Sequence, residues 1–293
     1  MTVSTKSGDI PFSAGYLAAA LLGIGISYET AYLNAFSISK LVVGTGKDRL
    51  TSAEIMDITI NWYGKHDKEL AERVKIMTED FNSIKPLIIL LGGVTGIGKS
   101  TISQVLGERL GIKSIIGTDL IRELLRVTIS KDLMPSLHTS SYIAYEQLDT
   151  SFMPALAESI VGFEEQARFV VVGIEAAIER AIHDNELMVI EGVHLVPGLI
   201  KSQIVKNDCV LQIQLHLEDE NIHRSRLKRR KGKSHNRGTS YSQYFDNIRE
   251  IQQYLHDQAI KHDIPIITVD EDEKALALIM KRIWKSKVPS VVE

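Results

Sequence analysis

Short runs of hydrophobic residues alternate with longer amphipathic stretches from residue 87 onward. The runs that have the length and composition of buried strands are 87–92, 113–117, 187–191, 209–216 and 264–269. Helical periodicity is found between them, at 99–110, 119–130, 141–148, 152–164, 166–184, 241–262 and 272–285. Strands that alternate with helices indicate a parallel sheet with helices on both faces, a three-layer α/β/α fold.

Residues 1–85 show helical periodicity and no convincing strand pattern. Capping signals begin three helices in this part, at Ser13, at Ser27 with Thr30, and at Thr51 with Glu54 as a capping box. A charged helix follows at 67–81, and Pro86 marks a boundary because the residue before a proline avoids the helical conformation. The sequence therefore predicts an all-helical N-terminal domain at 1–85 and a second domain at 86–293.

Composition narrows the class of protein. Of the 293 residues 44% are hydrophobic and 24% are charged, which is typical of a globular chain. The net charge of −3 gives no general attraction to nucleic acid, so any basic site must be local. Cys209 is the single cysteine, which favours a reduced, cytoplasmic location. The most apolar early segment, 16–26, is about half as long as a membrane span, so no membrane partner is expected.

A phosphate-binding loop follows the first predicted strand. The sequence G-V-T-G-I-G-K-S fits the pattern G-x-x-x-x-G-K-S. Its glycines let the backbone N–H groups turn inward, which a Cβ would hinder. Lys99 is expected to reach the β- and γ-phosphates of ATP, and Ser100 to bind Mg²⁺. The residues expected to contact the nucleotide are Gly93, Thr95, Gly96, Ile97, Gly98, Lys99, Ser100 and Thr101.

Polar residues follow two further strands, where ligands of a parallel sheet bind. Asp119 is either the N-cap of a helix or the group that accepts a proton from the acceptor hydroxyl and organises Mg²⁺. Arg122 and Arg126 share one helical face, which is either solvated or a clamp for an anionic acceptor. Glu191 ends a strand and is the second candidate for the metal or its water. His194 is either an ordinary loop residue or a substrate contact.

Basic residues are concentrated at 223–237, where eight of fifteen are Lys or Arg. This density fits a solvated helix face, a nucleic-acid patch or a lid over the phosphates. The acidic remainder of the chain argues against nucleic acid, so we favour a lid at about 223–240. Such a lid would bring arginines to the transferring phosphoryl group, and Arg226 and Arg229 are the catalytic candidates.

Several motifs together resemble the archaeal 2-phosphoglycerate kinases, over most of 86–270. They are the P-loop, T-D-L-I-R-E from Thr118, H-T-S-S-Y from His138, Gly162 with Gln166, I-E-R-A-I from Ile178, E-G-V-H-L-V-P-G from Glu191 and Y-F-D-N-I-R-E-I-Q from Tyr244. The resemblance implies a P-loop kinase of the nucleoside-kinase-like type. It further implies ATP- and Mg²⁺-dependent phosphorylation of 2-phosphoglycerate to 2,3-bisphosphoglycerate. On this reading the small anionic substrate contacts His138, Ser141, Tyr142 and Arg180 as well as Arg122 and Arg126.

The N-terminal part resembles the helical portion of an ATP-cone domain. Only K-S-G-D at 6–9 stands where full cones have a basic nucleotide-contacting strand, so a structural or homodimer-forming role is an alternative to ATP binding. Two other functions stay open at this point. One is a kinase of another phosphorylated acceptor or of seryl-tRNA, and the other is an ATP-sensing regulatory protein.

Overall fold

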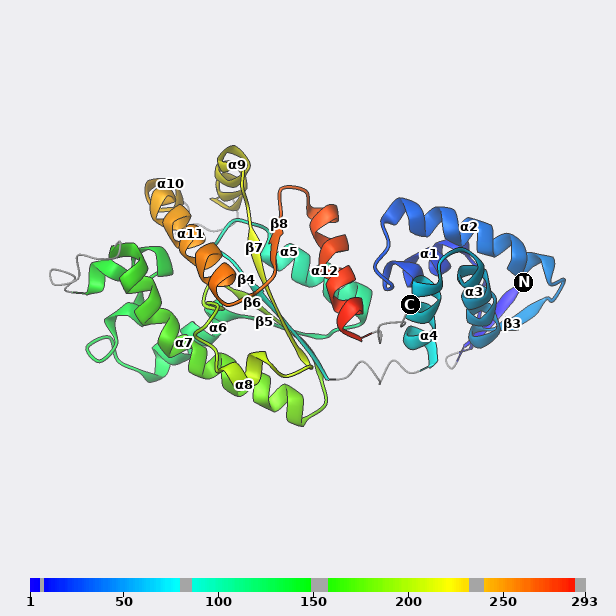
Figure 1. The fold of residues 1–293 in the computed structure, drawn as a ribbon, viewed down its shortest axis with the longest axis horizontal. Coiled ribbons are helices and arrows are strands. Elements are labelled where there is room, and N and C mark those ends of the chain that lie inside the picture. The colour runs from blue at the N-terminus through cyan, green and yellow to red at the C-terminus, as the bar shows by residue number, and fades with distance from the viewer. Residues whose placement is uncertain (6–7, 80–85, 149–157, 232–239, 288–293) are drawn as a thin grey trace. The chain divides into compact units, whose positions relative to one another are not determined.

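The computed structural model describes the chain apart from residues 6–7, 80–85, 149–157, 232–239 and 288–293 (Figure 1). Contacts within the chain define two compact units. Unit 1 contains residues 1–85 together with 276–293, and unit 2 contains residues 86–275. We expected every residue after 86 in one domain, whereas the segment from Leu276 onward packs with unit 1. In that segment the Trp284 indole Nε1 donates to the Gly23 carbonyl at 3.0 Å.

Unit 2 is built on a parallel five-stranded sheet. In chain order its strands are β4 (Leu87–Gly92), β5 (Ser114–Gly117), β6 (Leu187–Gly192), β7 (Val210–His216) and β8 (Ile266–Thr268). Their order across the sheet is β5-β6-β4-β7-β8, and every pairing is parallel. Each strand lies within two residues of a predicted one. The predicted α/β class is therefore confirmed, and β4 is central because its residues are hydrophobic on both faces.

Helices cover both faces of this sheet. Ile88 and Leu90 of β4 belong to a core formed with the residues of α6 and α7, whereas Ile89 and Leu91 are equally buried on the opposite face. The α-helices of this unit are α5 (Lys99–Leu110), α6 (Thr118–Thr128), α7 (Glu158–His183), α8 (Ser202–Val205), α9 (Glu220–Lys231), α10 (Ser240–Gln243), α11 (Phe245–Lys261) and the start of α12 (Asp272–Lys287).

Three helical segments of unit 2 differ from their predictions. The segment predicted as a helix at 141–148 forms a 3₁₀ helix, η3 (Ser141–Gln147), after a shorter one, η2 (Pro135–His138). The two helices predicted at 152–164 and 166–184 are one continuous helix over the described residues, α7. The helix predicted at 241–262 is interrupted at Tyr244, between α10 and α11.

Unit 1 contains a small sheet, so the prediction of an all-helical N-terminal domain was wrong. Its strands are β1 (Thr2–Thr5), β2 (Gly8–Pro11) and β3 (Arg49–Thr51), in the order β2-β1-β3. These strands have three or four residues each and few apolar positions, so they carry no readable periodicity. They form because β1 pairs with the adjoining strand β2 and with the distant strand β3. This pairing places Val3 and Leu50 in the core of unit 1.

The helices of unit 1 are α1 (Ala14–Leu22), α2 (Tyr28–Gly44), α3 (Ser52–His66) and α4 (Lys68–Glu79). All three capping predictions are confirmed: Ser13, Ser27 and Thr51 accept backbone N–H groups, and Thr51 forms a capping box with Glu54. Among the helices in the described part of the chain, none combines the length and the apolar character needed to cross a membrane.

Candidate active site

The loop between β4 and α5 has a backbone that only glycine can adopt. Gly93, Gly96 and Gly98 have φ angles of 149°, 86° and 101°. A Cβ on Gly93 would lie 2.4 Å from Ile97 Cδ1, and one on Gly96 would lie 2.5 Å from the Leu227 side chain. The Ile97 side chain is fully buried, so this residue anchors the loop and offers only its backbone to a ligand. The loop leads into the first turn of α5, where free N–H groups bind anions.

Lys99 and the second half of α9 face a common cavity. The cavity holds about 340 Å³ and is lined by Gly96, Gly98, Lys99, Ser100, Thr101, Arg226, Arg229 and Asp272. Lys99 is buried and its Nζ donates to the Val94 carbonyl at 2.7 Å, which holds the ammonium group inside the loop. The cavity therefore combines helix N–H groups, an ammonium and two guanidinium groups, which suits a polyphosphate.

Arg226 ties helix α9 to the phosphate-binding loop. Its Nη1 donates to the Ile97 carbonyl at 2.8 Å, and its Nη2 lies 3.0 Å from Asp272 Oδ1. Arg229 lines the same cavity from the next turn of α9. The second half of the predicted lid, 232–239, lies outside the described residues, so the lid as a whole stays a prediction.

Ser100 and two carboxylates meet at the ends of β5 and β6. The Ser100 hydroxyl donates to Glu191 Oε1 at 2.7 Å. Both line a small cavity of about 60 Å³ together with Thr95, Lys99, Thr118 and Asp119. Hydroxyl and carboxylate oxygens are the donors that Mg²⁺ prefers. Among the described residues no group of three or more His, Cys, Asp or Glu is arranged to hold a metal ion, so Mg²⁺ would share this site with phosphate oxygens and water.

A third cavity, of about 270 Å³, lies on the other side of Asp119, and we call it the acceptor cavity. It is lined by Val94, Thr95, Asp119, Arg122, Glu123, Arg126, His138, Thr139, Ser140, Ser141, Tyr142, Val193, Tyr241, Ile248 and Ile251. The structure thus brings together five of the predicted substrate residues and adds side chains from α10 and α11. Asp119 and Thr95 line this cavity and the small one. They therefore mark the place where an acceptor would meet the donor phosphate.

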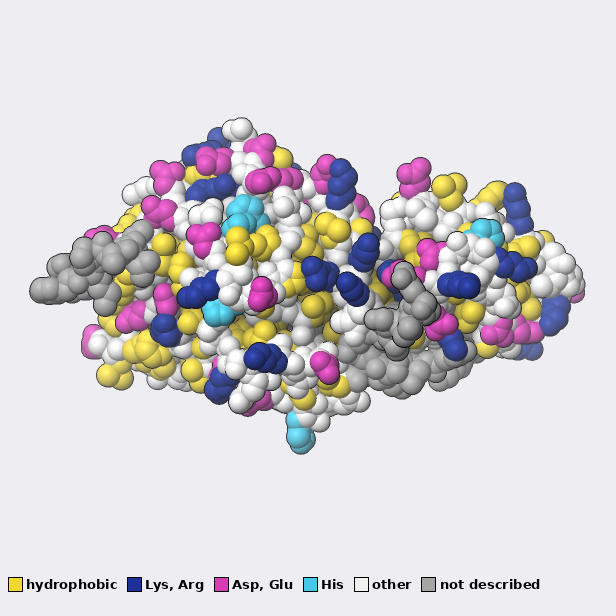
Figure 2. Space-filling view, viewed as in Figure 1, with side chains coloured by type: hydrophobic (Ala, Val, Ile, Leu, Met, Phe, Trp, Pro, Cys, Tyr) yellow, Lys and Arg dark blue, Asp and Glu magenta, His cyan; other side chains and the backbone are white. Residues whose placement is uncertain are grey.

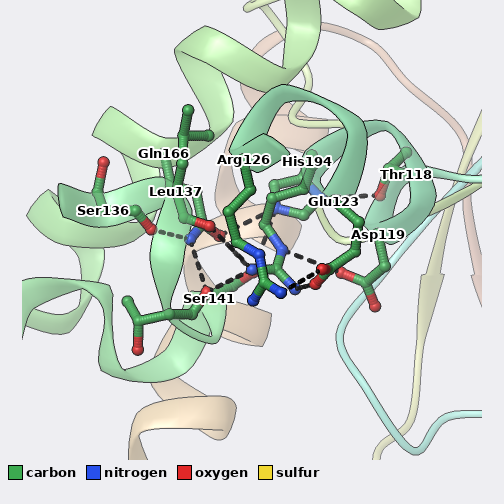
Figure 3. A network of polar contacts seen from close by, with 11 residues as sticks. Thr118, Asp119, Glu123, Arg126, Ser136, Leu137, Ser141, Gln166 and His194 are labelled. Atoms are coloured by element: carbon green, nitrogen blue, oxygen red, sulfur yellow. Dashed lines mark hydrogen bonds and ion pairs between the residues drawn. The ribbon is translucent and has the colours of Figure 1, made fainter. Parts of the chain in front are cut away.

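The two arginines of α6 have different environments, and Figure 3 shows Arg126 beside Glu123. Arg122 is 7% exposed, and its Nη1 donates to the carbonyls of Leu137 at 3.0 Å and Thr139 at 2.7 Å. Arg126 is more exposed and lies 3.0 Å from Glu123, which also accepts from Arg122 at 2.7 Å. Arg122 therefore fixes the wall of the cavity, and Arg126 is the more accessible cation. The sequence analysis did not name Glu123 as a site residue, although its i, i+3 spacing to Arg126 indicates an ion pair on one helical face.

His194 lies buried behind the acceptor cavity and joins both ends of the site. Its Nδ1 is 2.8 Å from the Thr118 hydroxyl, and its Nε2 is 3.0 Å from Gln166 Oε1 and 3.2 Å from the Ser141 hydroxyl (Figure 3). The Gln166 amide nitrogen donates to the carbonyls of Ser136 and Thr139, so its oxygen faces His194. His194 must then donate through Nε2, and in the neutral imidazole Nδ1 accepts from the Thr118 hydroxyl.

Burial keeps that imidazole neutral. His194 is fully buried, and the loss of solvation lowers its pKa from 6.5 to about 4. The Asp119 carboxylate opposes this shift, while Arg122 and Lys99 reinforce it. The expected substrate contact is thus replaced by a positioning role: His194 orients Ser141 in the acceptor cavity and Thr118 in the small one. His138 does line the acceptor cavity, and its Nε2 lies 2.9 Å from the Ile129 carbonyl.

Arg180 does not lie at the site, which corrects its prediction. It belongs to α7, as does Gln166, but fourteen residues separate them, about 21 Å along a helix axis. Its side chain is 82% exposed and pairs with Asp184 at 3.2 Å, near the start of β6 and away from Glu191 at the other end of that strand. The I-E-R-A-I motif therefore marks the end of α7 and not a wall of the cavity.

Known proteins resemble this chain over nearly its full length. The 2-phosphoglycerate kinase of Methanothermobacter thermautotrophicus is 36% identical over 288 residues, covering 98% of this chain and 94% of the relative. That of Pyrococcus furiosus is 38% identical over 284 residues, covering 95% and 91%. No family model matches the chain. Among solved structures, shikimate kinase from Acinetobacter baumannii covers 70% of this chain and 95% of its own, with a TM-score of 0.42 and 16% identity.

The structural score is low, so the fold class rests on the sheet order of the protein itself. The sequence relatives decide the family. Identities of 36% and 38% extend over at least 91% of each chain, and they include both units. On these grounds the chain belongs to the 2-phosphoglycerate kinase family.

Proposed function

We propose that the protein is an ATP-dependent kinase that phosphorylates 2-phosphoglycerate to 2,3-bisphosphoglycerate by direct in-line transfer. The observation that carries this proposal is the position of Asp119 between two cavities. One side faces the P-loop lysine and Ser100, and the other faces the arginines of α6. A donor phosphate and a small anionic acceptor can therefore approach each other without a covalent enzyme intermediate.

The donor side is formed by the P-loop, Lys99 and helix α9. Backbone N–H groups and the Lys99 ammonium would hold the β- and γ-phosphates of ATP, and Arg226 and Arg229 would face the charge that spreads over the transferring group. Mg²⁺, held beside Ser100 and Glu191, would supply charge neutralisation of the phosphates. The Ser100–Glu191 hydrogen bond holds both oxygens toward the same small cavity.

On the acceptor side the reaction needs a proton acceptor and cations. A bond forms between the substrate hydroxyl oxygen and the γ-phosphorus, and the bond to the β–γ bridging oxygen breaks. The hydroxyl proton passes to Asp119, whose carboxylate is 72% exposed and faces the cavity. The substrate carboxylate and phosphate would bind Arg126 and the polar groups of Ser141 and Tyr142.

A seryl-tRNA substrate requires a broad basic surface. On the visible face of the molecule Lys and Arg side chains are interspersed with Asp and Glu (Figure 2). The net charge of −3 fits this distribution. Both observations favour the small anionic acceptor.

The proposal is tested by ADP release from Mg²⁺-ATP with a panel of phosphorylated three-carbon acids. We expect 2-phosphoglycerate to stimulate release most, and Lys99→Ala and Asp119→Asn to abolish that stimulation while the fold is retained. If other acids stimulate and 2-phosphoglycerate does not, the assigned acceptor is wrong.

Arg126 offers a sharper test of the acceptor cavity. Arg126→Ala is expected to raise the KM for 2-phosphoglycerate about tenfold or more, because it removes a charge-assisted contact. Arg180→Ala is the matched control, since Arg180 is also an exposed helical arginine that pairs with a nearby acid. It should leave the KM unchanged. Equal effects of the two variants would contradict the placement of the acceptor.

A further inference from the structure

Helix α2 presents a hydrophobic stripe on the side opposite its buried face. Ala31, Ala35, Ile38 and Val42 are fully buried in unit 1. The opposite side carries residues spaced at i, i+4, i+7 and i+11 or beside them, and we call this set the α2 face: Glu29, Tyr32, Leu33, Phe36, Lys40 and Val43. Leu33 is 62% exposed and Phe36 is 59% exposed. One apolar face of α2 is already buried in unit 1, so the core does not need this second, exposed apolar face. A contiguous exposed apolar patch of this kind marks an interaction surface.

Two pairs of exposed side chains on this helix contact each other. The rings of Tyr28 and Tyr32 have centroids 4.7 Å apart, and the Lys40 ammonium lies 4.6 Å from the centre of the Phe36 ring. The α2 face thus carries exposed aromatic and aliphatic residues, with Glu29 toward one end and Lys40 toward the other. Aromatic residues are enriched at the centre of protein interfaces, and charged ones at the rim.

The order of residues along the α2 face is self-complementary. Glu29 and Lys40 are equally distant from a point between Asn34 and Ala35, and so are Leu33 and Phe36. If two copies of α2 pack antiparallel about a twofold axis through that point, Leu33 meets Phe36 of the other copy. Glu29 of each copy then lies level with Lys40 of the other copy. The two Glu29–Lys40 pairs are at opposite ends of the contact, about 16 Å apart along the helix axis. Like charges at positions 29 and 40 would make both of these contacts repulsive.

We propose that the α2 face is the contact surface of a homodimer, in which two copies of this helix pack antiparallel across a twofold axis. The partner that binds this face is a second copy of the same chain. When the helix is inverted against itself, each of these charges meets the opposite charge and Leu33 meets Phe36. Such isologous contacts bury one surface patch against itself, as cyclic dimers do. The proposal does not depend on the identity of the acceptor.

Sedimentation of the full-length protein over a range of concentrations tests the proposal. We expect a dimer, and Phe36→Glu should weaken it about a hundredfold or more because it places a charge at the centre of the contact. Val127→Glu is the matched control: Val127 is 83% exposed on α6, so it receives the same change on another apolar surface. A wild-type monomer at every concentration, or a dimer disrupted by Val127→Glu and not by Phe36→Glu, would overturn the proposal.

Charge reversal tests the antiparallel register. Glu29→Lys and Lys40→Glu, each alone, place like charges opposite each other twice per dimer and should weaken it about tenfold. The double variant restores both pairs and should recover most of the wild-type association. A double variant that dissociates as much as the sum of the single variants would exclude this register. Circular dichroism of each variant checks that unit 1 remains folded.

Discussion

His194 should make the stability of the protein depend on pH between about 4 and 6.5. In the folded protein burial lowers its pKa to about 4, whereas the unfolded chain has the ordinary value of 6.5. In that window the unfolded state binds more protons at this site than the folded state. The stability is therefore fully present above pH 6.5 and is lost progressively as the pH falls toward 4.

The size of the effect follows from these two values. The full difference of 2.5 pKa units corresponds to about 3 kcal/mol. Between pH 7 and pH 4.5 the unfolded histidine becomes almost completely protonated and the folded one only in part, so about 2 kcal/mol is lost over this interval. His223, whose pKa burial also lowers to about 4, contributes in the same direction.

Urea unfolding followed by circular dichroism at several pH values measures this loss. His194→Gln keeps a side chain that can accept from Thr118 and donate to Gln166, but it cannot be protonated in this range. We expect the variant to be less stable than wild type at pH 7, with a decrease between pH 7 and 4.5 that is smaller by about 2 kcal/mol. Exposed His183→Gln is the control and should retain the wild-type decrease. The same pH dependence in wild type and His194→Gln would refute the buried neutral imidazole.

Two further predictions concern neighbouring parts of the site. Gly192→Ala is expected to lower the unfolding free energy by about 3 kcal/mol, because its Cβ would lie 1.8 Å from the Thr118 hydroxyl and its φ is 159°; an unchanged melting temperature would contradict the close packing of these two residues. Glu191→Gln is expected to raise the Mg²⁺ concentration needed for half-maximal ADP release about tenfold, with little change in melting temperature. An unaltered Mg²⁺ requirement would assign the metal to Asp119 alone.

The sheet of unit 2 could be predicted because its strands are short runs rich in apolar residues. Five such runs alternate with helices, and few other folds accommodate that pattern. The strands of unit 1 could not be found in the same way. β1 and β3 each bury one apolar residue, Val3 and Leu50, whereas β2 buries none, and each strand forms only by pairing with another segment of the chain. Helix capping in unit 1 was predictable because it depends on neighbours within four residues. In unit 2 Asp119 is not the N-cap of α6, since that position is Gly117 and Asp119 lies in the first turn of the helix.

The residues of the site were likewise predictable only where their position follows from the local sequence or from the ends of the strands. Asp119 and Glu191 follow strand ends, and the parallel sheet brings strand ends together, so sequence reasoning could place them. The roles of Gln166 and Thr118 depend on a contact between α7, α6 and the loop after β6, which no local spacing encodes. Arg180 was misplaced for a related reason. The motif around it is adjacent in sequence to β6, but it lies at the opposite end of that strand from the acceptor cavity.

Glu123 explains how the acceptor cavity keeps its arginines in position without a ligand. It accepts from Arg122 and pairs with Arg126, so two cations near each other are partly neutralised. In the proposed reaction an incoming carboxylate or phosphate would compete with Glu123 for Arg126, and this competition would lower the affinity. In return Arg126 loses less side-chain freedom when the substrate binds, since it is already held beside the cavity. Arg122 does not take part in this exchange, because the carbonyls of Leu137 and Thr139 hold it in place. The cavity thus has one fixed and one exchangeable cation, which suits an acceptor that must enter and leave at each turnover.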